Sequence, residues 1–313
     1  MIGVHARPVW RRHLPIAGVF LAVFVWGIGP IFFLAVDMST FSAIFYRAIL
    51  WPPILFAITR VRHIQITWQT LKLSLIPGLV FGASTMSGFI AWKETSVANA
   101  TIIGNVSAAL ILFVAPRMLN EHVSRRQIIL SILSFGGVVG VVLGAGGSAG
   151  ATFSGDAIAL LNAVFWAAYF VASKRVRTAG VSTWTYLFGI SVFQLIVVVP
   201  WCLIVSRDIV DASIRDLSIM LAMSLIPGTL GHGLMVWAHR FVNASLTSLI
   251  GLFGPVISML SAWIIFNQVV APLQMLGAAV VLLSLAGVVR YGVKESVISD
   301  ALVTADPLLN SNP

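Results

Sequence analysis

The pentapeptide Ser-Leu-Ile-Pro-Gly occupies residues 74–78 and recurs at residues 224–228. A shift of 147 residues then brings nine further positions into identity, pairing Ala91, Gly104, Ala115, Asn120, Val123, Gln127, Gly140, Val141 and Val142 with Ala238, Gly251, Ala262, Asn267, Val270, Gln274, Gly287, Val288 and Val289. Five residues could recur by chance in an apolar chain, but further matches at one fixed offset indicate an internal duplication. The chain therefore consists of two related halves.

The composition places both halves in a lipid bilayer. Hydrophobic residues make up 59% of the 313 residues, charged residues make up 9%, and the mean hydropathy is +1.00. A soluble domain needs a more polar surface than these values provide, so they predict an integral membrane protein. The single cysteine, Cys202, excludes an internal disulfide and offers no metal-binding set, and no cofactor is expected.

Ten apolar runs can be marked along the chain, each long enough to cross a hydrocarbon core as a helix. Backbone polar groups in lipid must be paired within the protein, and the sequence lacks the alternating pattern of a closed barrel. The prediction is an all-α integral membrane protein with ten transmembrane helices. The runs lie at about 14–36, 40–59, 73–92, 97–119, 127–146, 153–173, 181–205, 217–238, 244–266 and 271–290.

Lys and Arg residues are divided unequally between alternate loops. With a cytoplasmic N-terminus, fifteen of them fall on the cytoplasmic side and three, Lys93, Arg207 and Arg215, fall on the other. Such an excess in short cytoplasmic loops is the usual topology signal, so both termini are expected in the cytoplasm. The net charge of +9 arises from this topology and forms no basic face for nucleic acid.

Five spans per half is an odd number, so the second half is expected to enter the membrane in the opposite direction from the first. Inverted repeats of this kind recur in secondary transporters, whose halves pack around a site near the bilayer midplane. We expect a cytoplasmic N-terminus at 1–13, a first repeat at 14–146, a second repeat at 147–292 and a cytoplasmic tail at 293–313.

Several segments resemble the EamA-type drug/metabolite transporter superfamily. Span six, LLNAVFWAAYFVASKRV at 160–176, is similar to the start of a second EamA repeat, with a Trp-Ala-rich centre and a basic end. Arg47 in span two and Leu119-Asn120-Glu121-His122-Val123 after span four are similar to the first repeat. The second half departs from this pattern, because Ile190 stands opposite Arg47 and Gln268 opposite Glu121.

The resemblance covers about residues 14–292. It implies export of small metabolites, and the bacterial branch that this chain most resembles includes amino-acid exporters. The expected location is the bacterial inner membrane, with a small-molecule substrate and the lipid bilayer as partners.

Helix-breaking residues recur in corresponding spans of the two halves. Proline bends a helix and frees a carbonyl, which lipid tolerates only where protein or a water-filled cavity pairs the backbone. The alternatives are hinges at a central cavity and ordinary proline kinks, and the recurrence favours hinges. The candidates are Gly29, Pro30, Pro77, Gly78, Pro227, Gly228, Gly254 and Pro255.

Polar and aromatic side chains within the broken spans are candidates for substrate binding. An amphipathic aromatic ring can pack on an apolar part of a substrate while its N–H or O–H group holds a polar part. Two of the polar residues, Asn105 and Ser107, are equally explained as hydrogen-bonding groups between helices. The candidates are Trp26, Ser84, Thr85, Asn105, Ser107, Trp166, Tyr169, His232 and Trp237.

Arg47 lies within span two, where a charged residue costs about 2.5–3.5 kcal/mol on insertion scales. It could hold a substrate carboxylate or fix a helix, and the structural role is favoured because span two is expected at the periphery. No Asp or Glu falls at a span centre, which leaves His232 as the obvious candidate proton carrier, although a hydrogen-bonded structural role is favoured for this histidine. A cavity without fixed charge is therefore expected, together with facilitated or loosely coupled transport of zwitterions.

The predicted function is export of amino acids or similar small neutral or zwitterionic metabolites by alternating access. A multidrug or hydrophobic-metabolite exporter is the main alternative. A membrane enzyme is disfavoured because no nucleophile–base pair or metal set converges at one depth. A channel or scaffold is a further alternative, and turnover that saturates with substrate would argue against it. Gly136, Gly140 and Gly144 form a small-residue face that allows close helix packing within a monomer or a weak homodimer.

Overall fold

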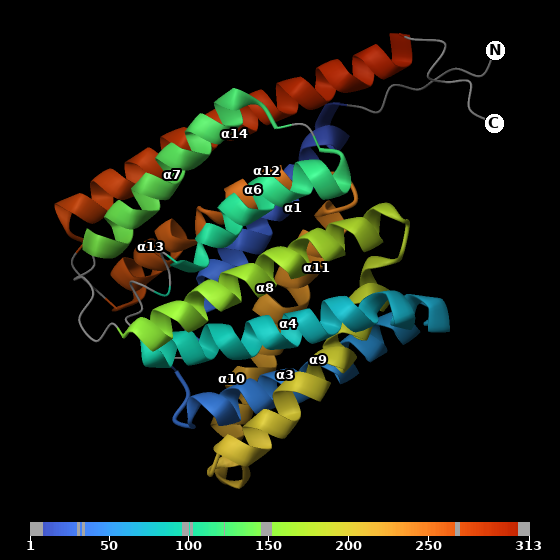
Figure 1. The fold of residues 1–313 in the computed structure, drawn as a ribbon. Helices are drawn as coiled ribbons and strands as arrows, with labels where there is room; N and C mark the ends of the chain where they lie inside the picture. Colours follow the sequence, from blue (N-terminus) through green and yellow to red (C-terminus); the bar gives the residue numbers. More distant parts are fainter. Residues whose placement is uncertain are drawn as a thin grey trace.

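The structure is a computed structural model, and it describes residues 9–29, 32, 35–95, 100, 103–121, 123–144, 152–266 and 270–305. Within these residues every regular element is a helix (Figure 1). The first half contributes α1 (Val9–Gly27), α3 (Thr40–Val61), α4 (Trp68–Glu94), α6 (Val106–Leu119) and α7 (Arg125–Gly144). The second half contributes α8 (Phe153–Thr178), α9 (Thr183–Val205), η1 (Ile209–Asp211), α10 (Ile214–Met223), the π-helical η2 (Ser224–Gly231), α11 (His232–Ala238), α12 (Ala244–Gly251), α13 (Gly254–Phe266) and α14 (Pro272–Ala305).

The described helices confirm the all-helical membrane class. Six segments are long and apolar enough to cross a bilayer: Thr40–Val61, Trp68–Ala91, Arg125–Gly144, Phe153–Thr178, Thr183–Val205 and Ile214–Ala238. Four shorter apolar helices accompany them, at Leu14–Gly27, Val106–Leu119, Ala244–Ile257 and Pro272–Gly287. Because only the described residues of these four are known to be apolar and helical, and those parts are shorter than a full crossing, the count of ten crossings stays a prediction.

Helix packing follows the same plan in both halves. The long helix α4 of the first half packs against α8 and α9 of the second. The corresponding span of the second half consists of α10, η2 and α11. It packs against α1 through η2 and α11, and against α3 through η2 and α10. The last helices of the halves, α7 and α14, pair with each other. Figure 1 shows that α1 and α8 run in opposite directions, as do α3 and α9. This is the arrangement that two inverted repeats produce.

Hydroxyl side chains mark where several helices begin. Ser39, Thr67, Thr152 and Ser213 each accept a hydrogen bond from the backbone N–H three residues further on, at the starts of α3, α4, α8 and α10. Such caps satisfy one of the donors that a helix N-terminus leaves unpaired. The starting points of these helices are therefore encoded locally.

The small-residue face of α7 contacts α14 of the same chain. A Cβ atom added at Gly140 would lie 3.3 Å from the Cα atom of Gly277, and one added at Gly144 would lie 2.6 Å from the Cγ atom of Gln274. At Gly136 an added Cβ would meet nothing within 4 Å. Two of the three predicted glycines thus serve close packing within the monomer.

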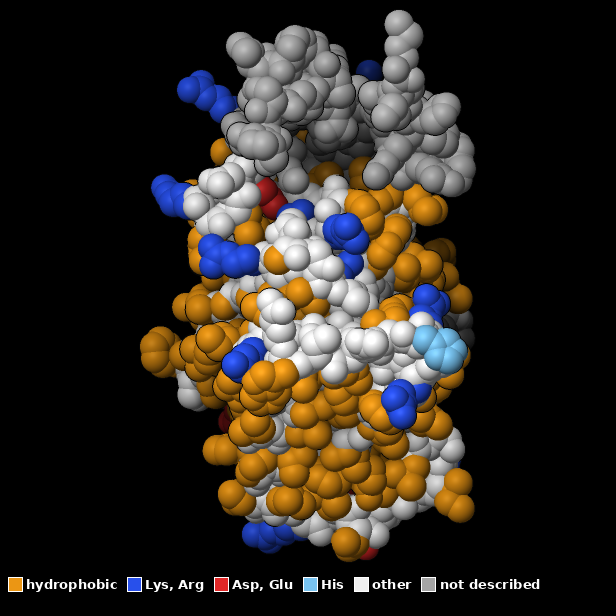
Figure 2. Space-filling view, turned by 90° about the vertical axis from the view of Figure 1, so that its right-hand side faces the viewer, with side chains coloured by type: hydrophobic (Ala, Val, Ile, Leu, Met, Phe, Trp, Pro, Cys, Tyr) orange, Lys and Arg blue, Asp and Glu red, His pale blue; other side chains and the backbone are white. Residues whose placement is uncertain are grey.

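Charges separate between the two ends of the helices. Basic residues lie in the last turns of α3, α6 and α8, namely Arg60, Arg117, Arg175 and Arg177. Figure 2 shows the face on the right-hand side of Figure 1, where Lys and Arg side chains are spread over the upper and middle parts. We call the end of the helix bundle that carries Arg60, Arg117, Arg175 and Arg177 the basic end. Acidic side chains mark the opposite, acidic end, where Asp37 pairs with Arg215 at 2.7 Å and Asp156 accepts a hydrogen bond from Thr95.

Candidate functional site

One cavity lies between the two halves and takes residues from both. Its volume is about 340 Å³. Helices α1, α3 and α4 form one part of its wall, and α8, α10 and η2 with the start of α11 form the other. The lining residues are Trp26, Gly29, Arg47, Phe81, Ser84, Thr85, Gly88, Phe89, Asn162, Trp166, Met223, Pro227 and His232.

Aromatic rings surround His232 at the centre of this wall. The ring centroid of His232 lies 4.8 Å from that of Trp26, 5.1 Å from that of Phe81 and 6.2 Å from that of Trp166. Trp51, behind the wall, lies 5.4 Å from His232 on the same measure. His232 is 4% exposed, so it is a component of a packed aromatic layer.

The π-helical segment η2 shapes the part of the cavity beside α1. Proline lacks the backbone N–H that would continue an α-helical ladder, and wider turns of this kind are frequent at functional sites. The carbonyl of Pro227 accepts a hydrogen bond of 3.2 Å from the Nε1 atom of Trp26. The indole N–H that sequence reasoning assigned to a substrate is therefore engaged within the protein.

Polar groups on the opposite wall link α4 to α8. The hydroxyl of Ser84 donates a hydrogen bond of 2.8 Å to the Oδ1 atom of Asn162. Gly88 allows this approach, because a Cβ atom there would lie 3.2 Å from the Nδ2 atom of Asn162. Thr85 lines the cavity on the same stretch of α4. These groups give the cavity a polar side facing its aromatic side.

Arg47 lines the cavity, which corrects the expectation of an uncharged one. Helix α3 packs against α9, η2 and α10 of the second half, so Arg47 lies where the two halves meet, and the structural role favoured for it stays a prediction. The Nε atom of Arg47 is buried and has no hydrogen-bond partner among the described residues. The cavity thus carries a fixed positive charge, whereas the sequence had suggested an uncharged one.

The structure brings five of the nine predicted binding residues to this cavity: Trp26, Ser84, Thr85, Trp166 and His232. Tyr169 lies behind the wall, fully buried, with its ring centroid 5.6 Å from that of Trp166. Trp237 packs instead against Phe241 and beside Gly18. Asn105 and Ser107 lie at the start of α6, away from the cavity lining.

The predicted hinge residues fall in different settings. Gly29 and Pro227 line the cavity, and Gly228 lies within η2 beside Trp51. Gly254 and Pro255 begin α13 after the break that separates it from α12. Pro77 lies within the continuous helix α4, and Gly78 packs tightly against α9. Pro30 lies outside the described residues.

Sequence reasoning missed several lining residues. The charge of Arg47 within an apolar span was a usable signal. Asn162 carried the signal of an amide within a span. Phe81, Phe89 and Met223 carried none, because nothing local distinguishes them from residues that face lipid.

The cavity lies nearer to the acidic end than to the basic end. It uses the C-terminal half of α4 and the N-terminal halves of α3 and α8, and these halves point toward the acidic end. On the other side of the aromatic layer, Lys174, Arg177 and His239 are buried. The basic end of the protein is therefore closed beneath the cavity.

A carboxylate from the first half ties this closed end together. Glu121 accepts hydrogen bonds from the backbone N–H groups of Ala244 and Ser245, at 2.6 and 3.0 Å, and from the Ser245 hydroxyl at 2.8 Å. These groups form the first turn of α12, where a negative charge is favourable. Lys174 of α8 donates to the carbonyl of Val242 in the same region.

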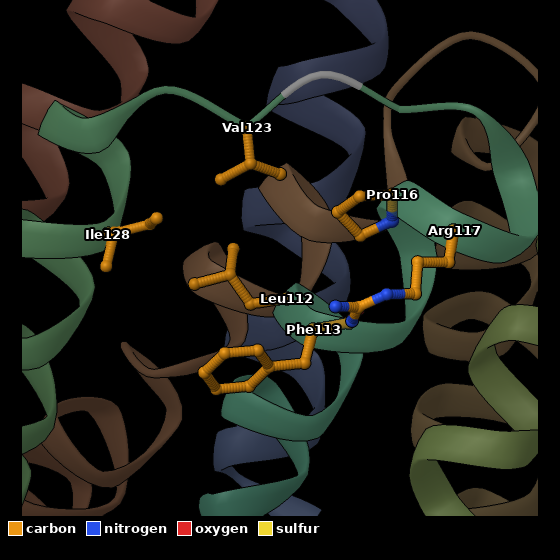
Figure 3. A pocket seen from close by; sticks show the side chains of 6 residues that line it. All are labelled: Leu112, Phe113, Pro116, Arg117, Val123 and Ile128. Atoms are coloured by element: carbon orange, nitrogen blue, oxygen red, sulfur yellow. The ribbon is translucent and has the colours of Figure 1, made fainter.

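A second cavity of about 350 Å³ lies between α6 and α7 (Figure 3). Its lining comes from the first half alone: Leu112, Phe113, Pro116, Arg117, Val123 and Ile128. Figure 3 shows the Arg117 side chain folding back along α6, and its Nη1 atom donates to the carbonyl of Phe113 at 3.1 Å. Because it does not involve the second half, this cavity does not fit an alternating-access site between the repeats.

No group of three or more His, Cys, Asp or Glu side chains that could hold a metal occurs among the residues that the structure describes. The chemistry of the central cavity is that of hydrogen bonding, charge and ring contact. A helical membrane protein with two repeats around such a cavity has the architecture of a secondary transporter.

The chain belongs to the EamA-like transporter family, which matches residues 13–143 and 153–290 as two copies. It is 27% identical over 232 residues to the uncharacterized transporter YyaM of Bacillus subtilis (strain 168), which covers 69% of this chain and 73% of YyaM. It is 20% identical over 241 residues to the pseudopaline exporter CntI of Pseudomonas aeruginosa (strain UCBPP-PA14), which covers 77% of this chain and 83% of CntI.

A solved crystal structure aligns with a TM-score of 0.77 and 15% identity, covering 90% of this chain and 99% of its own. At this identity the likeness shows the fold alone. The resemblance to EamA transporters that the sequence suggested is confirmed, and the chain is a transporter of the drug/metabolite transporter superfamily.

Proposed function

We propose that this protein exports amino acids or similar small zwitterionic metabolites across the bacterial inner membrane by alternating access. The observation that carries this proposal is the cavity shared by both repeats, which combines Arg47, a polar pair and an aromatic wall. Arg47 suits a carboxylate, the rings suit an apolar side chain, and the Oδ1 atom of Asn162 suits an ammonium group. The site is one of binding, and no residue in it is assigned a catalytic role.

The proposed orientation places the basic end and both chain termini in the cytoplasm. Lys and Arg gather at that end, as they do in cytoplasmic loops of membrane proteins. The cavity would then open toward the outside in this conformation, with the aromatic layer and the Glu121 network closing the cytoplasmic side. Exchange with an inward-open state would require α12 to part from Glu121, with η2 and the α12–α13 break as bending points.

The proposed coupling is facilitated or loose. Among the described residues that line the cavity there is no Asp or Glu to carry a proton. The relative named as an exporter supports export as the direction. We propose that the protein acts as a monomer or a weak homodimer.

Export of hydrophobic drugs is the second candidate, supported by the aromatic wall. A lipophilic cation would meet Arg47 with no compensating carboxylate among the described lining residues. The amino-acid hypothesis is therefore preferred.

Counterflow in proteoliposomes tests the proposal. Vesicles preloaded with an unlabelled amino acid should accumulate a labelled one from outside in a saturable manner. Trp166→Ala should reduce this exchange by at least about tenfold, because a ring that fills a binding pocket is a typical affinity hot spot. Trp201→Ala is the matched control, since Trp201 is 50% exposed on α9 and does not line the cavity. Absence of exchange for every amino acid, with folded protein, would refute the amino-acid proposal.

A further inference from the structure

We propose that the central cavity is a carboxylate site anchored by Arg47, and that it binds small organic monoanions with an apolar body more tightly than the corresponding zwitterions. This inference rests on the proposed transport function and specifies the substrate class of the same site. Three features carry it: the charge of the cavity, the unpaired buried N–H of Arg47 and the shape of the apolar wall.

The charge of the cavity is unbalanced. Among the described lining residues, Arg47 is the one Lys or Arg side chain, and no Asp or Glu is present. Arg47 makes no ion pair in the described part of the chain, where Arg215 pairs with Asp37. A bound monoanion would neutralise the site, whereas a zwitterion would bring an ammonium group that finds no fixed negative charge there.

One hydrogen-bond donor of the cavity lining lacks an acceptor. The Nε atom of Arg47 can only donate, and it is buried without a partner in the described residues. The Nδ1 atom of His232, which donates or accepts according to its tautomer, is also buried and unpaired. Buried donors without acceptors are costly, so sites that retain them generally receive an acceptor from elsewhere. A carboxylate supplies two oxygens that accept hydrogen bonds, and it matches the fork of a guanidinium group.

The remaining wall accommodates an apolar body of limited size. Trp26, Phe81 and Trp166 present aromatic rings around His232. At about 340 Å³, the cavity lies near the lower limit of typical ligand pockets, which is about 300 Å³. The site therefore fits a carboxylate joined to one ring or to a branched aliphatic group.

A series of four ligands with one phenyl body separates the contributions of the polar groups. L-Phenylalanine carries both charges, 3-phenylpropionate only the carboxylate, phenethylamine only the ammonium group, and 3-phenylpropionamide neither. Binding to the full-length protein in detergent is measured by isothermal titration calorimetry. We expect 3-phenylpropionate to bind most tightly, L-phenylalanine less tightly, and the amide and the amine at least about tenfold more weakly than 3-phenylpropionate.

Substitution of Arg47 ties the selectivity to this residue. Arg47→Gln should weaken 3-phenylpropionate binding by about 10- to 100-fold, the range expected for loss of charged hydrogen bonds, while leaving amide binding unchanged. Arg47→Lys keeps the positive charge but removes the planar guanidinium group that can hold both carboxylate oxygens. It should therefore weaken 3-phenylpropionate binding less than Arg47→Gln does. Arg60→Gln is the matched control, because Arg60 lies exposed in the last turn of the same helix. Thermal unfolding shows whether each variant is folded. If Arg47→Gln is not folded, the comparison with the unsubstituted protein is made with Arg47→Lys.

The outcomes distinguish the site from the function. Tighter binding of phenethylamine than of 3-phenylpropionate, or unchanged 3-phenylpropionate binding in folded Arg47→Gln or Arg47→Lys, would overturn the carboxylate site. Amino-acid counterflow that persists in Arg47→Gln would leave the transport proposal standing without this site. Arg47-dependent binding of 3-phenylpropionate without counterflow of any amino acid would support the carboxylate site and refute amino-acid transport.

Discussion

At the scale of single residues, Asp208 shows how a carboxylate joins the two repeats at the acidic end. It lies between α9 and α10, and its oxygens accept hydrogen bonds of 2.6 Å from the backbone N–H and hydroxyl of Ser39 and from the hydroxyl of Ser42. Ser206 donates a further bond of 2.8 Å. Burial acts to raise the pKa of Asp208, but the hydrogen bonds from Ser39, Ser42 and Ser206 outweigh it and hold the pKa well below its usual range.

This shift predicts a pH-dependent contribution to stability. Because the pKa of Asp208 is lower in the folded than in the unfolded protein, its contribution is present above the unfolded value, about 3.9, and is lost as the pH falls through the folded value. Asp208→Asn should therefore lower the melting temperature at pH 7, and its difference from the unsubstituted protein should shrink as the pH falls below about 4. Differential scanning fluorimetry of both proteins, from pH 7 to below about 4, measures the difference in melting temperature. Asp211→Asn, at an exposed neighbouring carboxylate, is the control, and a gap that stays constant with pH would contradict the interpretation.

At the scale of elements, contact between α1 and η2 joins the repeats directly at the cavity. A Cβ atom added at Gly231 would lie 2.7 Å from the Nε1 atom of Trp26. That nitrogen is held by its hydrogen bond to Pro227, so the ring cannot move away without breaking the bond. The absence of a side chain at Gly231 thus sets the position of a lining residue.

Gly231→Ala should consequently impair both stability and transport. Overpacking of a well-packed site typically costs about 1–3 kcal/mol, and displacement of Trp26 should also slow counterflow. Gly136→Ala is the matched control: an added Cβ there meets nothing within 4 Å, so this change should be neutral or stabilise the protein by up to about 1 kcal/mol. Thermal unfolding and counterflow are measured on both variants. Equal behaviour of the two would show that the α1–η2 contact is not a constraint.

At the scale of the whole molecule, the two ends of the helix bundle differ in charge and in closure. The basic end is closed by the aromatic layer and by Glu121, which links the first repeat to α12. The cavity lies toward the acidic end. If the basic end faces the cytoplasm, this conformation binds or releases substrate on the outer side.

Cysteine accessibility tests this orientation. Cys202 is buried, and Cys202→Ser gives a background for single cysteines. In spheroplasts, a membrane-impermeant thiol reagent should modify Thr85→Cys, in the cavity, and should not modify Arg60→Cys at the basic end. In inside-out vesicles Arg60→Cys should react. The reversed pattern would place the basic end outside and contradict the proposed topology.

The sequence alone was sufficient to predict the helical membrane class, the duplication and the transporter family. These follow from properties of the residues themselves: an apolar run of sufficient length partitions into lipid as a helix wherever it lies in the chain. Strongly polar or aromatic positions within broken spans, such as Trp26 and His232, were also recognisable because such residues are unusual there.

Tertiary structure alone decided which of these side chains meet. Whether a residue faces the cavity depends on the rotation of its helix and on the neighbour against which the helix packs, and neither is encoded in a local window. Arg47 lines the cavity because α3 packs against η2 and α10, whereas Trp237 turns toward Phe241 although it lies in the same span as His232. The sequence thus determined that a cavity between two repeats should exist, and the packing of the helices determined that the cavity is charged.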